Sequence, residues 1–225
     1  KLAVIGDNRP RLYWSMVAVQ ALGGIPVPLY QDSVAGEMVY VLENADVKYA
    51  IVQNQEQTDK LLEIKDRLPH LEHICYEEPR GMRDYNHEFI HFYKDIQEQG
   101  SVFNRENPDF YLHEIEQGQG SDIAIFLYTS GTTGKPKGVV LTSDNLIITA
   151  RNSIAFDSLT GEEEVLAYLP MAWVGDNIFS LAQAYVTGFC VNCPEGPETV
   201  MTDLREIGPT YYFAPPAVYE SVLTK

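Results

Sequence analysis

The sequence is poor in basic residues and in long hydrophobic runs, and each shortage excludes a class of protein. Only 16 Lys and Arg stand against 32 Asp and Glu among 225 residues, so the formal net charge is −16. A field of that sign repels nucleic acid and anionic membranes, and we expect neither as a partner for the body of the chain. No apolar run approaches bilayer-spanning length and no signal-peptide pattern opens the sequence, so we expect no transmembrane segment.

Cysteine is also scarce, and its three residues cannot all pair with one another. Cys190 and Cys193 form a C-x-x-C in the short apolar run FCVNC, but no second C-x-x-C exists. Reduced, half-buried thiols in a strand are therefore favoured over zinc or redox chemistry, which indicates a cytoplasmic protein. The chain begins at Lys1 without an initiator Met and stops soon after an apolar stretch, so we expect a piece of a longer protein.

Short apolar runs alternate with amphipathic segments along most of the chain, which predicts an α/β fold with doubly wound, mostly parallel sheets flanked by helices. We divide the chain into a first block (1–120), irregular from about residue 79, and a second block (121–225), both parts of one larger domain. The expected strands are 1–6, 25–30, 48–52, 73–77, 122–128, 137–142, 165–170, 189–193 and 210–214. The expected helices are 11–22 (after a cap at Asn8), 35–45, 56–68, 143–156 (capped by Ser143), 175–188, 197–208 and 216–224.

The stretch Phe126–Thr142, FLYTSGTTGKPKGVVLT, concentrates hydroxyls, glycines and two lysines between two apolar runs. Glycines let backbone N–H groups approach a ligand closely, and successive exposed N–H groups form an anion-binding concavity. Hydroxyls add donors, and Lys135 and Lys137 add charge that the acidic chain otherwise lacks. The loop is not a Walker loop, because β-branched, strand-like residues follow it in place of a helix. These features predict a polyphosphate site between two strands, with a mobile Gly/Thr hairpin as the alternative.

The string YTSGTTGKPKG resembles the signature phosphate loop of the acyl-adenylate-forming superfamily, which includes acyl-CoA synthetases, luciferases and adenylation domains of peptide synthetases. AVQALGGIPVPLY is similar to the early helix–turn–strand block of that family, and YLPMAW to the segment that follows its phosphate loop. GPTYYFAPPAVYE resembles a later stretch of long-chain fatty acyl-CoA synthetases. The resemblance therefore spans nearly the whole chain, and it is weakest between residues 79 and 120.

The resemblance implies an ATP-dependent ligase that converts a fatty acid to an acyl-adenylate and transfers the acyl group to coenzyme A. It implies small-molecule partners (ATP, the acid and coenzyme A), Mg²⁺ as a cofactor, and peripheral membrane contact as an open option for a longer protein. Lys137 and Thr133 are the implied catalytic residues, Thr129 is the implied Mg²⁺ neighbour, and Trp173, Val174 and Asn177 are the implied substrate-pocket residues. The implied ATP-binding residues are Thr129, Ser130, Gly131, Thr132, Thr133, Gly134, Lys135, Lys137 and Gly138.

The sequence departs from the family pattern at several points. Trp173 stands where many CoA ligases have His, and either an aromatic pocket wall or plain core packing suits it. Ala217 replaces an expected Arg, which puts a charge role there in doubt. The family's Y-G-x-[ST]-E motif, ribose-binding Asp, hinge and C-terminal lysine do not occur, so we expect the chain itself to be catalytically incomplete. An aryl or short-chain acid, or a carrier-protein acceptor, remains an alternative to the long-chain CoA ligase.

A different class of function is raised by HEFIH, residues 87–91, which matches H-E-x-x-H. On a helix, His87 and His91 would share one face and could bind zinc, with Glu88 as general base. A third ligand would come from His113, Glu114 or Glu116. The short pattern and the surrounding α/β alternation argue against this reading, and nearby aromatic residues favour packing in a surface helix. A non-catalytic nucleotide-binding module is a further alternative for the chain by itself.

Overall fold

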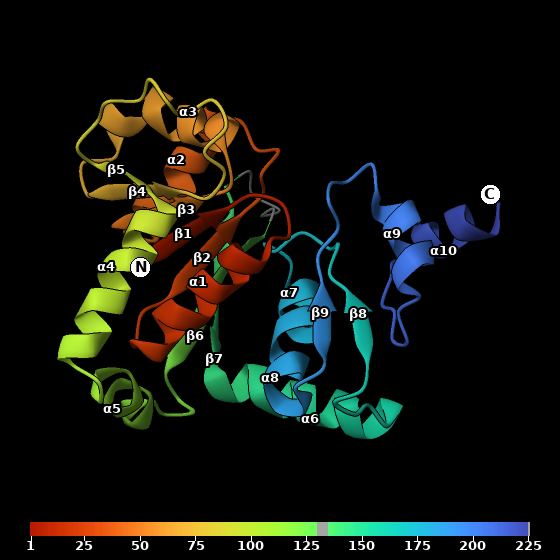
Figure 1. Cartoon of the computed structure of the whole chain (residues 1–225). Coiled ribbons are helices and arrows are strands. Elements are labelled where there is room, and N and C mark those ends of the chain that lie inside the picture. The colour runs from red at the N-terminus through yellow and green to blue at the C-terminus, as the bar shows by residue number, and fades with distance from the viewer. Residues whose placement is uncertain (130–134, 225) are drawn as a thin grey trace.

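Strands and helices alternate through the first half of the chain. The computed structural model describes residues 1–129 and 135–224 (Figure 1). In the first half the elements are β1 (Leu2–Ile5), α1 (Pro10–Ala21), β2 (Pro26–Leu29), α2 (Ala35–Asn44), β3 (Tyr49–Val52), α3 (Gln55–Glu63), the 3-10 turn η1 (Lys65–Arg67), β4 (His73–Tyr76), β5 (Ile90–Phe92), α4 (Tyr93–Glu106) and α5 (Phe110–Gln117).

One five-stranded parallel sheet, in the order β2-β1-β3-β4-β5, organises these elements. The chain first builds to one side of β1 and then to the other, so the sheet is doubly wound, as predicted. Successive side chains of a strand point to opposite faces. Ala3 and Ile5 of β1 accordingly pack with α2 and α3, whereas Leu2 and Val4 pack with α1 and with residues of the second half. Both faces of β1, an interior strand of the sheet, are therefore buried.

Smaller sheets organise the second half of the chain. Its elements are β6 (Ile123–Thr129), β7 (Lys137–Thr142), α6 (Ser143–Asp157), β8 (Glu164–Leu166), α7 (Val174–Asp176), the π-helical segment η2 (Asn177–Ala182), α8 (Gln183–Thr187), β9 (Cys190–Asn192), α9 (Val200–Ile207) and α10 (Pro216–Leu223). β6 and β7 pair antiparallel, and β8 and β9 pair parallel. The core that contains Leu2 and Val4 also contains Ile125 and Leu181, so the two predicted blocks share one hydrophobic core.

Both predicted helix caps are wrong. The N-cap of α1 is Arg9 and makes no side-chain cap bond, because the Asn8 amide is engaged in contacts with Tyr13 and Leu169. The N-cap of α6 is Thr142, whose hydroxyl accepts from the Asn145 N–H while the Asn145 side chain accepts from the Thr142 N–H. This reciprocal capping box satisfies more backbone groups than a single Ser143 cap would.

Two predictions about strands are also corrected. Residues 210–214 form only an isolated bridge between Tyr211 and Val165. Pro209 and Pro215 flank this stretch and lack the N–H groups that would extend a ladder. Conversely, the region from 79 to 120, expected to contain only short helices and loops, supplies the edge strand β5 and the 14-residue helix α4.

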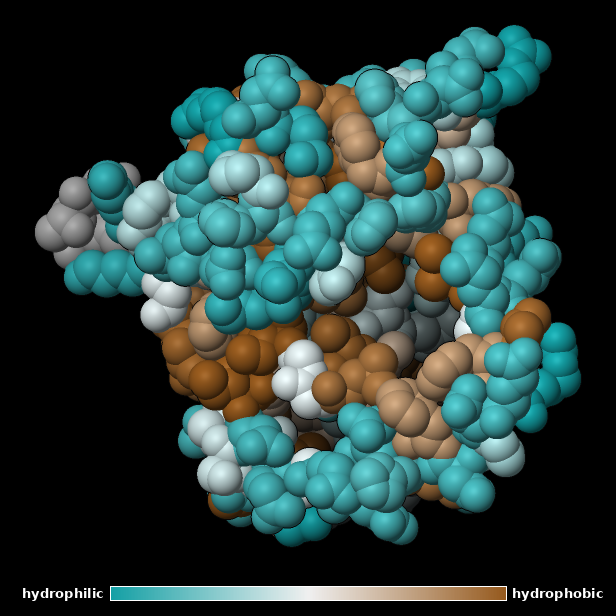
Figure 2. All heavy atoms as spheres, turned by 90° about the vertical axis from the view of Figure 1, so that its left-hand side faces the viewer, coloured by the Kyte–Doolittle hydropathy of each residue, from teal (hydrophilic) through white to brown (hydrophobic). Residues whose placement is uncertain are grey.

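The aromatic segment expected as a surface helix lies mostly before α4. Phe92 is in β5 and stacks on Tyr76 with ring centroids 5.3 Å apart. Hydrophobic residues gather on the side of the molecule where α4 lies (Figure 2), and α4 itself exposes Ile96, Val102 and Phe103. Among the described residues, no helix combines the length and the hydropathy needed to cross a bilayer.

Gly6, at the end of β1, offers a direct test of this packing. A Cβ at Gly6 would lie 2.5 Å from Gln53 Cβ and 2.8 Å from Leu12 Cδ1, whereas a Cβ at Gly100 in α4 would meet nothing within 4 Å. We expect Gly6→Ala to lower the free energy of unfolding by about 1–3 kcal/mol through overpacking. Gly100→Ala should instead raise it by up to about 1 kcal/mol, because Ala favours the helix. Urea denaturation of both variants measures the difference, and equal effects would contradict the packing at β1.

Candidate functional site

The two ends of the predicted phosphate loop are held together by the β6–β7 ladder. Thr129 pairs with Lys137 and Tyr128 pairs with Gly138, at the loop end of both strands. The loop therefore joins two strands, as the sequence predicted. Ser130, Gly131, Thr132, Thr133 and Gly134 lie outside the described residues, so their assigned roles stay predictions.

Gly138 lies where a side chain would crowd the ring of Tyr128. A Cβ at this position would lie 3.3 Å from Tyr128 Cζ on the paired strand. The Tyr128 ring can therefore cross the backbone of β7, and its hydroxyl donates to Asn44 Oδ1 at 2.7 Å. Gly138 leaves room for Tyr128, which ties β6 to the end of α2, and its assignment as an ATP-binding residue stays a prediction.

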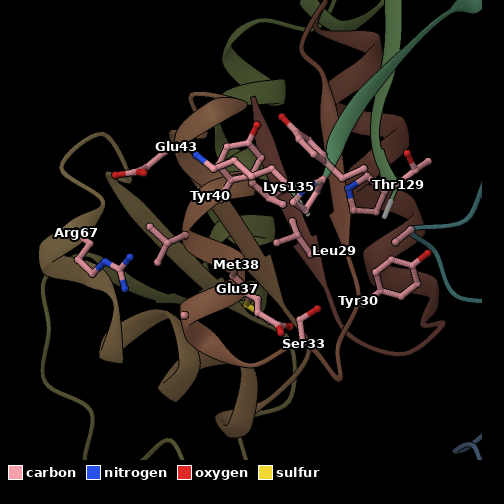
Figure 3. A pocket seen from close by; sticks show the side chains of 17 residues that line it. Leu29, Tyr30, Ser33, Glu37, Met38, Tyr40, Glu43, Arg67, Thr129 and Lys135 are labelled. Carbon is pink, nitrogen blue, oxygen red and sulfur yellow. The ribbon is translucent and has the colours of Figure 1, made fainter. Parts of the chain in front are cut away.

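A cavity of about 650 Å³ opens beside these loop ends. It lies between the end of β2, α2 and the loop flanks, with Tyr30, Tyr40, Thr129 and Lys135 in its wall (Figure 3). Its volume is in the range of small-molecule sites. The Lys135 ammonium lies 5.3 Å from the centroid of the Tyr40 ring, at the distance of a cation–π interaction. The negative face of the ring attracts the ammonium group.

Charge at the cavity is mixed. Glu37, Glu43 and Arg67 also belong to its wall. Lys137, the first residue of β7, is exposed, so it stands in solvent next to the loop. Lys135 and Lys137 are thus two cations at one end of a hairpin within a strongly acidic chain. Such a local positive charge attracts an anionic ligand, whereas the acidic remainder of the surface repels it.

The predicted substrate-pocket residues take different positions. Trp173 and Val174 are 42% and 48% exposed, and Ala172 beside them lines the cavity. Burial raises the pKa of the Tyr30 phenol, and the side chain of Trp173 opposes that rise. The exposure of Trp173 excludes the alternative that it is plain core.

Asn177 is buried and faces backbone. Its amide nitrogen donates to the carbonyl oxygens of Met171 at 2.8 Å and of Trp173 at 2.7 Å. The residue therefore holds the turn that carries Trp173 and does not face the cavity. Its 1% exposure leaves no surface for a substrate.

Sequence reasoning missed a buried polar network at the carboxyl end of β1. The Tyr13 hydroxyl donates to the Asp176 carboxylate, with oxygen distances of 2.8 and 2.9 Å. Asn8 Nδ2 lies 2.6 Å from the Tyr13 oxygen, 2.9 Å from the Leu169 carbonyl oxygen and 3.3 Å from Asp176 Oδ1. The available signal was the position of Asn8, since polar residues just after a central parallel strand gather at the functional edge of such a sheet.

Asp176 is fully buried, and burial raises its pKa to about 7. Hydrogen bonds from Tyr13, Ser180 and Asn8 oppose that rise by stabilising the carboxylate. Burial and the nearby Asp176 charge in turn raise the pKa of Tyr13 well above its usual range. The network therefore holds a carboxyl group that changes charge near neutral pH inside the protein core.

The H-E-x-x-H interpretation fails on geometry. His87 precedes a turn and His91 lies on β5, so the two do not share a helical face. His91 Nε2 instead contacts His73 Nδ1 at 2.8 Å, and burial together with that neighbour lowers the pKa of His91. No group of three potential metal ligands occurs within residues 1–129 and 135–224.

Comparison with known sequences gives a coherent result. The sequence model of the AMP-binding enzyme family matches residues 1–225. Long-chain-fatty-acid–CoA ligase ACSBG1 of Rattus norvegicus is 31% identical over 232 residues, which covers 100% of this chain and 31% of that protein. Long-chain-fatty-acid–CoA ligase ACSBG2 of Gallus gallus is 29% identical, with 100% and 30% covered. The chain thus spans about a third of the length of these curated relatives.

Solved structures share the fold. The anthranilate CoA ligase AuaEII in complex with anthranoyl-AMP superposes with a TM-score of 0.73 at 20% identity, covering 95% of this chain and 39% of that one. The o-succinylbenzoate CoA synthetase of Bacillus subtilis, in complex with its acyl-adenylate intermediate, gives a TM-score of 0.70 at 21% identity, covering 100% and 52%.

The raised pKa of Asp176 predicts a pH dependence of stability. The folded-state pKa of about 7 exceeds the ordinary value of 3.8, so folding retains a proton between these values and stability falls as the pH rises through that window. We therefore expect the melting temperature of the wild type to fall more between pH 5 and pH 7.5 than that of Asp176→Asn. Asp66→Asn, a change at an exposed carboxylate, should keep the wild-type slope. Parallel wild-type and Asp176→Asn slopes in differential scanning fluorimetry would contradict the assignment.

Proposed function

The chain belongs to the AMP-binding enzyme family, and from that premise we propose that the complete protein is an ATP-dependent, AMP-forming long-chain fatty acid–CoA ligase. A carboxylate oxygen of the acid attacks the α-phosphorus of ATP, pyrophosphate leaves, and the acyl group of the resulting acyl-adenylate then passes to the thiol of coenzyme A with release of AMP. We also propose a cytoplasmic location. This 225-residue chain supplies the phosphate loop and its supporting sheet.

The observation that carries the proposal is the geometry at the loop ends. The β6–β7 register sets Thr129 opposite Lys137, and the cavity with Lys135 in its wall opens directly beside them. A ligand bound by the loop would thus meet two lysines in a chain that is otherwise strongly acidic. This arrangement favours a polyphosphate over a neutral or cationic ligand.

The residues act by position and charge. Phosphoryl oxygens carry the negative charge of ATP, and an acid nucleophile adds more, so neutralisation and alignment lower the barrier. Lys137 and Lys135 supply positive charge at the loop, and hydroxyl and backbone donors of residues 129–134 hold the β- and γ-phosphates. Because Tyr128 is tied to Asn44 on α2, the end of β6 is fixed relative to the sheet.

Mg²⁺ is a cofactor that the family implies. The ion commonly binds through one or two carboxylates together with substrate phosphates and water. The described residues offer the Thr129 hydroxyl at the exposed end of β6 and no group of three potential ligands. We therefore assign Thr129 a supporting contact to an ion that would be held mainly by ATP.

The acid class rests on sequence. The relatives at about 30% identity across the whole chain are named as long-chain-fatty-acid–CoA ligases. The aryl-acid ligases among the solved structures are about 20% identical, and that likeness concerns the fold. A long-chain acid is therefore favoured over an aryl acid, and coenzyme A over a carrier protein.

We expect Lys137→Ala in the complete protein to slow acid-dependent ATP–pyrophosphate exchange by on the order of 10²-fold, because one positioned charge is lost at the phosphates. Lys94→Ala, a matched change at an exposed lysine of α4, should leave the exchange unchanged. Both variants should keep the wild-type melting temperature, since both side chains are exposed. Exchange at the wild-type rate in Lys137→Ala would contradict the assigned role of this lysine.

The 225-residue chain alone should not release AMP when it is incubated with ATP, Mg²⁺, palmitate and coenzyme A. Groups that act as a unit lose nearly all activity when one is removed, and the chain lacks the Y-G-x-[ST]-E motif of the family. Weak ATP binding should remain, and equilibrium dialysis with labelled ATP detects it. Acid-dependent AMP release that Lys137→Ala abolishes would show that the catalytic set is complete within these residues.

A further inference from the structure

The Asn8–Tyr13–Asp176 network joins parts of the chain that are more than 160 residues apart in sequence. Asn8 follows β1, Tyr13 lies on α1 and Asp176 ends α7. The exposed fractions of Asn8, Tyr13 and Asp176 are 6%, 7% and 0%, so the network is closed to solvent. Such a network, once satisfied, specifies one arrangement of the segments that it connects.

What the network fixes is the segment Leu169–Trp173. Asn8 binds the carbonyl of Leu169 at its start. Asn177, next to Asp176 in the chain, binds the carbonyls of Met171 and Trp173 at its end. The Trp173 N–H closes a turn on the Pro170 carbonyl at 2.8 Å. The start of this turn is therefore hydrogen-bonded by Asn8 of the network, and its end by Asn177, the neighbour of Asp176.

The turn places Trp173 beside the candidate site. Met171 and Ala172 are buried, Ala172 lines the cavity together with Tyr30, and the next residue, Trp173, emerges to the surface, where its side chain acts on the Tyr30 phenol. Leu169 and Asp176 are joined to Trp173 by a short, hydrogen-bonded turn. A shift of Leu169 or Asp176 would therefore move the Trp173 indole relative to Tyr30. The position of the exposed Trp173 side chain is thus set by the buried network, whose residues cannot themselves contact a substrate.

We propose that Asn8, Tyr13 and Asp176 are positioning residues, which set the place of Ala172 in the cavity wall and of Trp173 beside it, and thereby tune the proposed adenylation site. The role of the network in catalysis rests on the proposed function, whereas its hold on Trp173 does not. The network touches no substrate. Its effect on catalysis runs through the Leu169–Trp173 turn alone.

Ionisation of Asp176 gives this arrangement a distinctive readout. The charged or titratable groups that face the network are Tyr13 on α1, Cys193 after β9 and, near Cys193, the guanidinium of Arg9. Burial raises the pKa of Cys193 to about 12, and burial also raises the pKa of Tyr13 well above its usual range. Between pH 6 and pH 8, Asp176 is therefore the group of the network that changes charge.

The first measurement is the fluorescence of Trp173. The chain contains two tryptophans, so Trp14→Phe leaves Trp173 as its single reporter. In that background we expect the emission maximum to titrate with a midpoint near pH 7, the pKa of Asp176. Asp176→Asn should abolish the titration, and Asn8→Ala should increase acrylamide quenching about twofold by loosening the turn. Thr58→Val removes an equally buried hydroxyl of α3 that bonds to the Asn54 carbonyl, and it should change neither property.

The second measurement is the pH profile of acid-dependent ATP–pyrophosphate exchange in the complete protein. Asp176→Asn should remove the inflection near pH 7 from kcat, and Tyr13→Phe should lower kcat on the order of tenfold while KM for ATP stays within about twofold. The folded fraction of each variant is measured at every pH and divided out of kcat, because stability itself depends on the ionisation of Asp176. Thr58→Val serves as the control for lost stability.

The outcomes separate the two ideas. Trp173 emission that does not titrate in the wild type, or that titrates equally in Asp176→Asn, overturns the positioning role. An inflection in the kcat profile that Asp176→Asn retains overturns the link to catalysis. Absence of exchange in the wild-type protein contradicts the proposed function, and the emission titration then decides the hold on Trp173 by itself.

Discussion

The buried contact between Tyr13 and Asp176 is the interaction on which the arrangement of this molecule depends. It ties α1, the helix after β1, to α7, the helix that follows the Leu169–Trp173 turn. The contact lies in the core that the two halves of the chain share. A buried carboxylate is costly unless its oxygens are hydrogen-bonded, and here Tyr13, Asn8 and Ser180 provide those bonds. Replacing Asp176 by an apolar residue would leave the Tyr13 hydroxyl without this acceptor, and replacing Tyr13 would remove one of the three donors to Asp176, so the contact helps to specify how the two halves meet.

The loop after β1, which contains Asn8, also holds neighbouring segments in place. Arg9 donates from its guanidinium to the carbonyls of Pro194 and Glu195, so the loop after β1 also holds the segment after β9. On the other side, the Asp7 N–H donates to Gln53 at the end of β3. The end of β1 is therefore a point where several segments are bonded to one short loop. Through Asn8 this loop is also bonded to Leu169, at the start of the turn that carries Trp173.

The spacing of apolar residues, and the glycine and polar residues that bound the apolar runs, made most of the fold predictable. Apolar runs such as LAVI, bounded by polar or glycine residues, predicted the parallel strands, and the apolar runs on either side of residues 129–136 predicted the strands β6 and β7. Local pattern could not show that Asn8 would turn away from the helix and bond to Leu169, because that partner lies 161 residues away. Asp176 looked like an ordinary polar residue at a helix start, and only the packed core reveals it as buried. The isolated bridge at Tyr211 likewise depends on pairing with β8, which no local signal sets.

The central claim, activation of a fatty acid by attack on the α-phosphate, is tested most directly by isotope transfer. The complete protein is incubated with ATP, coenzyme A and palmitate that carries ¹⁸O in both carboxylate oxygens, and the products are analysed by mass spectrometry. The account predicts that AMP acquires one ¹⁸O atom, because the attacking oxygen stays on phosphorus when the thiol takes the acyl group. Label in inorganic phosphate, or AMP without label despite acyl-CoA formation, would contradict it.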